Sequence, residues 1–323
     1  MPSFSVQVPD GAESIRVDKY IASLPAAVSR SQLKSGSARI FINDTPVKFS
    51  AKVAAGDVVR AEWKDTVPDD IAPQDIPLNI LYEDDDVTVV DKSQGMTTHP
   101  AAGNWTGTLV NALLFHWGRP ASAALTAGTD AERAAAFRPG IVHRLDKDTS
   151  GVIITARNRA SEAWLQEQFQ TRRVKKEYIA IVCGRPPAAR GSIKTQIFRD
   201  PRHRKLFKAE SSVSKGKFAH TEYRCIACYG PFSLMKLRLK TGRTHQIRVH
   251  MKYIGCPILG DPLYGRRGKQ ELFAGAQLML HAYRLSLRLP QSEQFSEFKA
   301  PVPQRFKAVL RVLHRHYEKC ILT

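Results

Sequence analysis

The segment His143–Gly151 reads HRLDKDTSG and separates two short apolar stretches, PGIV at 139–142 and VIIT at 152–155. We expect both apolar stretches to be core strands. The nine residues between them hold two carboxylates, three basic side chains and a glycine. Packing so many ionisable groups between strands costs free energy unless the groups are paired or used in function. The segment therefore predicts an active-site loop, with a charged surface turn as the alternative.

Asp146 is the expected reactive group of this loop. Arg144 precedes it by two residues and Lys147 follows it directly. A carboxylate among fixed cations stays ionised at neutral pH, which suits a nucleophile or an electrostatic stabiliser better than a general acid. Asp148 is expected instead to accept backbone amides and, with Thr149-Ser150-Gly151, to shape the turn.

The charge of the whole chain indicates a polyanionic partner. The 323 residues carry a formal net charge of +19, from 49 Lys and Arg against 30 Asp and Glu. Nucleic acid and an anionic membrane surface are the two classes that such charge attracts. No apolar run approaches the ~20 residues of a membrane-spanning helix, and the N-terminus lacks a signal pattern. Nucleic acid is therefore favoured.

Cysteine usage favours a reducing cytoplasm. The chain has five cysteines, an odd number in a long sequence, which argues against a disulfide framework. Cys225 and Cys228 have the spacing of half a zinc site, but no second pair follows at zinc-finger distance. They lie in the strand-like run TEYRCIACY, where residues three apart face opposite sides. We expect two buried thiols and no metal.

The patterning predicts an α+β protein with a small domain at 1–64, a linker at 65–77 and a large domain at 78–323. In the small domain, 15–24 has helical spacing, Asn43-Asp44 is a turn between strands, and Ser31 caps a second short helix. The linker is rich in Pro and Asp.

The large domain reads mostly as strands with occasional helices, which indicates a mixed, mostly antiparallel sheet flanked by helices and loops. Asn158 is a candidate cap of one helix, and 304–320 has the 3.6-residue period of another. Neither a GxGxxG nor a GxxxxGK[ST] loop occurs, so no dinucleotide or P-loop cofactor is indicated.

Two known short motifs match this loop, but the rest of the chain does not fit either of them. D-x-D-T resembles the start of haloacid-dehalogenase-type phosphatases, which form an aspartyl phosphate with Mg²⁺. Those enzymes need downstream acids and a parallel sheet, whereas the acids at 84–86 lie upstream. HRLD resembles the kinase HRD loop, but a Gly-rich loop and a DFG motif are missing.

A third pattern covers nearly the whole chain. It consists of the ordered motifs DKSQGMTTHPAAGNWTGTLVNALL (91–114), RPGIVHRLDKDTSGVIITARN (138–158), VKKEYIAIVCG (174–184), RDPRHRK (199–205), LKTGRTHQIRVHMKYIGCPILGDPLYG (239–265) and LMLHAYRLSL (278–287). These motifs resemble those of the RluA/RluD family of ribosomal RNA pseudouridine synthases, and the N-terminal unit resembles an S4 RNA-binding domain. Several ordered motifs at compatible spacing are far more specific than one.

The resemblance implies an isomerase that converts uridine in large-subunit ribosomal RNA to pseudouridine without a cofactor or metal. It implies catalytic roles for Asp146, for Tyr178 against the uracil, and for Arg243, which would pair with the aspartate. Arg144 would enter the RNA where the flipped base has left. Taken alone, Tyr178 would be interpreted as a core tyrosine and Arg243 as a surface arginine. Only the full set of motifs predicts catalytic roles for them.

The S4-like unit is expected to bind RNA through basic residues, namely Arg30, Lys34 and Arg39. Ser93-Gln94 depart from the family, which usually has Pro after the Lys, and the expected Gly before RDPR is missing. These departures leave the RNA target open. Transfer RNA is an alternative substrate, and a non-catalytic ribosome-assembly factor is an alternative function. We expect a cytoplasmic monomer.

Overall fold

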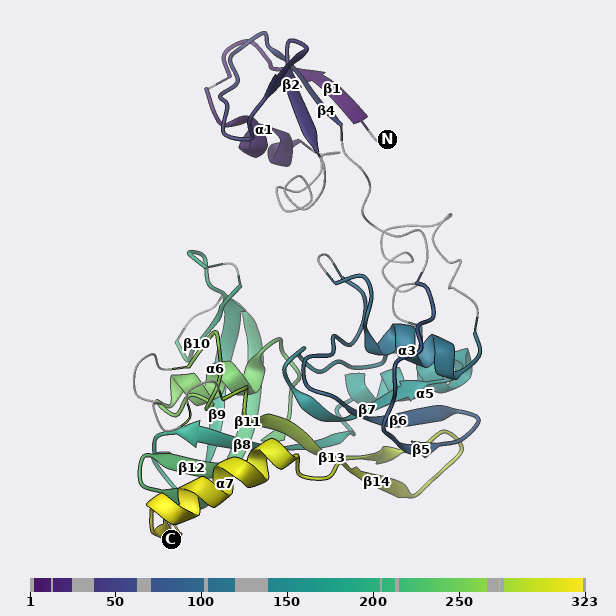
Figure 1. Ribbon diagram of the computed structural model, residues 1–323, viewed down its shortest axis with the longest axis vertical. Helices are drawn as coiled ribbons and strands as arrows, with labels where there is room; N and C mark the ends of the chain where they lie inside the picture. Colours follow the sequence, from purple (N-terminus) through teal and green to yellow (C-terminus); the bar gives the residue numbers. More distant parts are fainter. Residues whose placement is uncertain are drawn as a thin grey trace.

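Two β-sheets, one of four strands and one of eleven, organise the protein (Figure 1). Each sheet has its own hydrophobic cluster. The computed structural model describes residues 3–12, 14–24, 38–62, 71–101, 104–119, 139–203, 205–212, 215–265, 273 and 276–321. Among these residues no helix is long and apolar enough to cross a membrane.

The N-terminal unit contains the four-stranded sheet, in the order β1-β4-β2-β3. Its elements are β1 (Ser3–Gln7), α1 (Val17–Ser23), β2 (Arg39–Ile42), β3 (Thr45–Val47) and β4 (Val58–Glu62). Asn43 and Asp44 connect β2 to β3 with φ of 50° and 59°, the left-handed geometry that two-residue hairpins favour. Val17, Tyr20 and Ile21 of α1 are buried against this sheet, as their helical spacing predicted.

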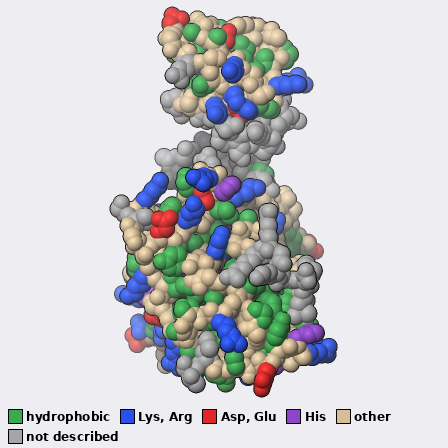
Figure 2. Space-filling model, turned by 90° about the vertical axis from the view of Figure 1, so that its left-hand side faces the viewer, with side chains coloured by type: hydrophobic (Ala, Val, Ile, Leu, Met, Phe, Trp, Pro, Cys, Tyr) green, Lys and Arg blue, Asp and Glu red, His purple; other side chains and the backbone are tan. Residues whose placement is uncertain are grey.

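The predicted basic surface of this unit is described only in part. Arg30, Lys34 and the helix expected after Ser31 lie outside the described residues. Arg39 begins β2 and is exposed. Figure 2 shows Lys and Arg side chains on this unit and on the same face of the large unit.

The large sheet has the order β10-β9-β11-β12-β8-β13-β7-β6-β5, with β14 paired to β13 and β15 to β11. Its strands are β5 (Ile80–Glu83), β6 (Val87–Lys92), β7 (Ser150–Ala156), β8 (Lys175–Cys183), β9 (Arg190–Arg199), β10 (Phe207–Glu210), β11 (Lys217–Tyr229), β12 (Phe232–Leu239), β13 (Leu280–Arg288), β14 (Phe295–Lys299) and β15 (Lys319–Cys320). Within the described chain only β7 and β13 pair in parallel. The sheet is mixed and mostly antiparallel, as predicted.

Helices accompany this sheet in the described ranges: α3 (Leu109–His116), α5 (Arg159–Gln170), α6 (Gln246–Tyr253) and α7 (Gln304–His316). The Asn158 side chain accepts the N–H of Ser161 and begins α5, as predicted. Helix α5 packs on β7, and α6 packs on β10 and β11. The C-terminal helix ends at His316, earlier than its sequence pattern indicated, and strand β15 follows.

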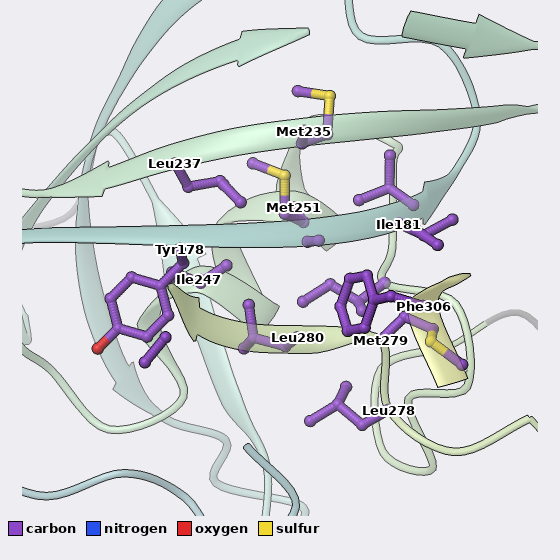
Figure 3. Packing of buried hydrophobic residues seen from close by; sticks show 14 of the residues in the cluster. Tyr178, Ile181, Met235, Leu237, Ile247, Met251, Leu278, Met279, Leu280 and Phe306 are labelled. Atoms are coloured by element: carbon purple, nitrogen blue, oxygen red, sulfur yellow. The ribbon is translucent and has the colours of Figure 1, made fainter. Parts of the chain in front are cut away.

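The main core lies under the centre of the large sheet. Met235 and Leu237 of β12, Met251 of α6 and Leu280 of β13 pack into one buried cluster (Figure 3). Tyr178 of β8 lies at the edge of this cluster, and its hydroxyl points away from the apolar side chains. The core therefore fixes the ring while leaving the oxygen outside it.

One of the two predicted flanking strands is absent. Residues 139–142 make a single bridge, Ile141 to Thr155, through the hydrogen bond from Ala156 N to Gly140 O at 2.8 Å. Pro139 has no N–H to donate, and Gly140 has φ of 71°, so neither residue suits an extended strand. Only the second apolar stretch, inside β7, is a strand.

The two cysteines of β11 are buried, as expected, but they do not face opposite sides. A bulge between Cys225 and Ala227 shifts the register of the strand, and an extra residue reverses the alternation that follows it. The Sγ atoms of Cys225 and Cys228 lie 3.5 Å apart. Burial raises the pKa of the Cys225 thiol to about 12, so this thiol is inert at neutral pH.

Residues from Ile71 onward already pack on the large unit. The Ile71 side chain is buried in the main core. The amide of Asn111 donates to Ala72 O at 2.8 Å, and Gln74 N donates to Asn111 O at 3.0 Å. The second half of the Pro- and Asp-rich segment is thus held by α3.

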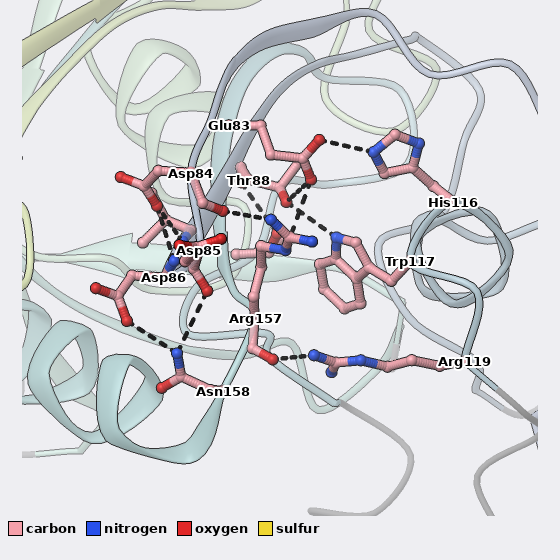
Figure 4. A network of polar contacts seen from close by, with 12 residues as sticks. Glu83, Asp84, Asp85, Asp86, Thr88, His116, Trp117, Arg119, Arg157 and Asn158 are labelled. Carbon is pink, nitrogen blue, oxygen red and sulfur yellow. Dashed lines mark hydrogen bonds and ion pairs between the residues drawn. The ribbon is translucent and has the colours of Figure 1, made fainter.

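The acidic run at 84–86 has a structural use (Figure 4). Asp84 Oδ1 accepts the N–H groups of Asp86 and Val87 at 2.9 and 2.7 Å, which closes the turn between β5 and β6. Asp86 Oδ1 accepts the side-chain amide of Asn158 at 2.8 Å. These carboxylates therefore join the turn to the start of α5.

Gly151 is the second residue of β7, close to the loop that carries Asp146, and we predict that Gly151→Ala destabilises the protein by about 3 kcal/mol or more. Gly151 has φ of +115°, and a Cβ there would stand 2.2 Å from the backbone oxygen of Ala282. Gly107→Ala is the control, since its φ of +68° carries strain but nothing lies within 4 Å; it should cost only about 1–2 kcal/mol. Denaturant unfolding measures both, and equal losses would contradict the steric argument.

Candidate active site

A cleft of about 400 Å³ opens at the centre of the large unit, beside Tyr178. Three segments and one further residue, Leu280 of β13, line it. The segments are the loop 142–149, the stretch from the end of α5 into β8, and the connection from β12 into α6. The predicted residues Arg144, Asp146, Tyr178 and Arg243 all belong to this lining. Residues about one hundred positions apart in the sequence thus share one cavity.

Asp146 faces two basic side chains of the third segment. Its Oδ2 lies 3.6 Å from Nη1 of Arg248 and 3.9 Å from Nε2 of His245, and 18% of the side chain is exposed. Burial lowers the pKa of His245, and the charge of Asp146 opposes that change. Arg248 is therefore the permanent positive charge beside the carboxylate.

Arg248 is itself held by a buried ion pair. Its Nε and Nη2 donate to the two oxygens of Asp261 at 2.8 and 2.7 Å, and the two side chains are 4% and 0% exposed. Burial opposes the charge of Arg248, but the Asp261 hydrogen bonds and the charges of Asp261 and Asp146 raise its pKa. The planar fork leaves Nη1 directed at Asp146.

The expected pair between Arg243 and Asp146 is not among the ion pairs of the described residues. Arg243 Nε donates instead to the carbonyl of Phe218 at 3.0 Å. Its backbone N–H donates to Gln246 Oε1, also at 3.0 Å. Sequence reasoning assigned the pairing to the wrong arginine of TGRTHQIR. A usable signal was present, because an arginine between the apolar residues Ile247 and Val249 of a buried helix needs a partner.

Tyr178 lines the cleft and carries a neutral hydroxyl. Burial raises its pKa above the ordinary value, and the nearby charge of Asp146 raises it further. The side chain is 7% exposed, and its hydroxyl points away from the core (Figure 3). Arg144, by contrast, is exposed on the same loop as Asp146. Its charge contributes to the lowered pKa of His245, so the two side chains lie near each other.

The segment 92–98, whose role sequence reasoning missed, holds the loop that carries Asp146. Lys92 is fully buried, and its Nζ donates to the carbonyls of Ser93, Met96 and Lys147 at 2.9, 2.8 and 3.3 Å. Three carbonyls match the three donors of an ammonium, although burial lowers the pKa of Lys92 to about 7. Thr98 Oγ1 donates to Leu145 O at 2.9 Å.

Gln94 completes this attachment, although it stands near the family's usual proline. Its side-chain amide donates to Asp148 O at 2.9 Å and to Leu278 O at 3.0 Å. The turn is closed by Thr149 N donating to Asp146 O at 3.0 Å. The expected side-chain bonds from Asp148 to backbone amides are not among those recorded for the described chain. The loop is therefore shaped by its backbone and by its neighbours.

The arrangement defines an enzyme site in which one carboxylate, beside a fixed cation and an aromatic wall, faces a basic cleft. The family model for RNA pseudouridylate synthase matches residues 86–253. The chain belongs to this family, as its motifs predicted, and it is an RNA pseudouridine synthase, an isomerase.

Relatives of similar length support the assignment. An uncharacterized RNA pseudouridine synthase of Chlorobaculum parvum is 42% identical over 314 residues, covering 92% of this chain and 93% of the relative. Ribosomal large subunit pseudouridine synthase D of Borreliella burgdorferi is 39% identical over 311 residues, covering 94% and 91%. The solved structure of human RNA Pseudouridylate Synthase Domain Containing 1 matches with a TM-score of 0.57 and 26% identity, covering 76% of this chain and 90% of that one.

The two arginines should respond differently to replacement by lysine. Arg248→Lys loses the fork that bridges Asp261 and Asp146, so we expect turnover to fall about 100-fold or more. Arg243→Lys keeps a charge at the cleft wall and should mainly raise KM. Steady-state pseudouridine formation separates kcat from KM. A larger kcat loss in Arg243→Lys would show that the arginine facing Asp146 in solution is Arg243.

Lys92→Met should lower turnover by about 100-fold with little change in KM, because the loop that carries Asp146 loses its attachment and small displacements of reacting groups are costly. It should also destabilise the protein by about 1–3 kcal/mol, since buried carbonyls lose their donor. Lys299→Met, on exposed β14, is the control and should alter neither quantity. Unchanged turnover in Lys92→Met would refute the positioning role.

Proposed function

We propose that this enzyme isomerises specific uridines of large-subunit ribosomal RNA, with Asp146 as its catalytic group. The observation that carries the proposal is the position of Asp146, which lies 3.6 Å from the buried Arg248 in a basic cleft that Tyr178 also lines. Relatives that match over nine-tenths of both chains bear the name ribosomal large subunit pseudouridine synthase D. The net charge of +19 suits a polyanionic substrate.

The reaction breaks the N1–C1′ glycosidic bond, turns the uracil and joins C5 to C1′, after which the proton on C5 leaves and N1 gains one. Asp146 either adds to C1′ or removes the 2′ proton, and both roles require the ionised carboxylate. Arg248 supports that form, because its Nη1 lies 3.6 Å from the carboxylate. The cation also stabilises negative charge that returns to Asp146 when an adduct breaks down.

Tyr178 is proposed to hold the uracil and to assist the proton transfer from C5. Its ring can stack against the base. Because burial and Asp146 raise its pKa, the phenolate is disfavoured, so the hydroxyl acts as a neutral hydrogen-bonding group. It can accept a proton only while it passes its own to another acceptor.

Access to the cleft requires that the uridine leave its stack, since the reacting atoms are covered inside folded RNA. Arg144 is exposed on the loop that carries Asp146, which suits the arginine that fills the place of the flipped base. Arg243 is proposed to contact RNA at the cleft wall. Residues 1–64, with Arg30, Lys34 and Arg39, are proposed as an S4-like RNA-binding domain, separate from the catalytic domain of residues 78–323.

Two alternatives stay distinguishable by experiment. If transfer RNA were the substrate, the reaction in the cleft would be the same, but a different surface of the protein would recognise the RNA. An aspartyl-phosphate hydrolase would need Mg²⁺ and further acids in the cleft, whereas Asp146 is the only carboxylate that lines it in the described part of the chain. We expect the enzyme to act as a cytoplasmic monomer.

Asp146→Asn should abolish product formation while RNA binding stays within about threefold of wild type, because the amide keeps the shape but lacks the charge. Pseudouridine mapping across total RNA, with and without the protein, identifies the sites that depend on it. Sites lost from large-subunit RNA support the proposal, and sites lost only from transfer RNA replace the substrate. Full isomerisation by a clean Asp146→Asn preparation would contradict the catalytic role.

A further inference from the structure

Lys176 lines the cleft and takes no part in the proposed isomerisation. It stands two residues before Tyr178 on β8 and lines the same cavity. Residues i and i+2 of a strand point to the same face, with Cα atoms about 7 Å apart. Lys175 points to the other face, where its Nζ lies 5.0 Å from the centroid of the Phe295 ring. Two adjacent lysines thus face different environments.

The Lys176 ammonium has no acidic partner among the described residues. Neighbouring acids are taken: Glu177 pairs with Lys236 at 2.9 Å, and Glu222 pairs with Lys240 at 3.1 Å. The contact recorded for Lys176 Nζ is the Phe169 ring, whose centroid is 5.6 Å away. Burial lowers the pKa of Lys176, and no carboxylate offsets it. A partly desolvated cation without an anion is unfavourable in the free protein.

The surroundings of Lys176 leave it open to a ligand. A Cβ built at Gly242 would stand 3.6 Å from the Lys176 Nζ, so the missing side chain leaves room above the ammonium. The His143 ring stacks on the Phe169 ring, with 4.5 Å between their centroids. Burial, with a smaller contribution from Lys176, lowers the pKa of His143 to about 3, so this imidazole is neutral and adds no charge.

The charge balance of the cleft points the same way. Asp146 is the one acid among the lining residues in the described chain, and it shares Arg248 with Asp261. The cationic residues that line the cleft are Arg144, Arg172, Lys176, Lys240, Arg243 and Arg248. The cleft therefore has positive charge to spare beyond what the carboxylate needs, and Lys176 is the unpaired cation on the same strand face as Tyr178.

We propose that Lys176 binds a backbone phosphate next to the flipped uridine and so anchors the extruded nucleotide. The inference rests on the proposed function, because it assumes that the base lies against Tyr178. When the base of a flipped nucleotide enters the cleft, its phosphates lie toward the rim. Lys176 is one strand repeat from Tyr178, the residue that would contact the base. A phosphate would stabilise the charged ammonium in place of the water that burial removed. A neutral carbonyl oxygen of uracil would stabilise that charge less.

The test compares Lys176→Met with Lys175→Met, both in the Asp146→Asn background so that no product forms. The probe is an unmodified transcript of large-subunit ribosomal RNA, and its affinity is measured over a range of salt concentrations. Losing one phosphate contact lowers the slope of log K against log salt by about 0.7–0.9. We expect this change, with weaker binding, for Lys176→Met and none for Lys175→Met. Lys176→Arg should retain the wild-type slope.

An unchanged slope in Lys176→Met would overturn the phosphate contact, and weaker binding at unchanged slope would indicate a contact to the base. An equal change of the slope in Lys175→Met would show a general effect of net charge and would also overturn the phosphate contact of Lys176. Removing an unpaired buried cation should not lower thermal stability; should Lys176→Met fail to fold, Lys176→Gln takes its place. Failure of the proposed function is a separate result, because it appears as absent pseudouridine formation by the wild-type chain.

Discussion

The site depends on one buried arginine placed between two carboxylates. Arg248 is bound at two points by Asp261 and presents its remaining Nη1 to Asp146. Removing such a charge from water is costly, and only close, well-aligned partners offset the cost. The pair therefore fixes both the start of α6 and the segment around Asp261. A carboxylate on a separate loop then meets a cation that cannot move or lose its proton.

The second constraint is the rigidity of the loop that carries Asp146. A reactive carboxylate among cations would otherwise pair with whichever cation moves nearest. The bonds from Lys92, Gln94 and Thr98 to loop carbonyls fix the backbone of the loop. This loop brings both Asp146 and the exposed Arg144 to the lining of the cleft. The large sheet contributes Tyr178 from its central strand. Chemistry and scaffold thus meet where β8, β13 and β7 lie side by side.

Local patterns predicted the parts of this protein that local physics decides. The helix cap at Asn158, the hairpin turn at Asn43-Asp44 and the face of α1 follow from spacing and from side-chain hydrogen bonding. The absent strand at 139–142 had its own local warning in Pro139 and Gly140. The bulge at Cys225 had none that alternation alone could reveal, because a bulge depends on the partner strand.

By itself, the sequence determined the class of enzyme, the reactive aspartate as a prediction, and the need for a polyanionic partner, since these depend on residue identity and total charge. Tertiary structure decided which arginine faces Asp146. Arg243 and Arg248 are five residues apart and each carries one positive charge, so the sequence alone does not distinguish them. It also decided that Lys92 supports the loop and that Lys176 has no acidic partner in the described chain. Pairing depends on distance and direction across elements that lie far apart in the chain, and neither is encoded in local spacing.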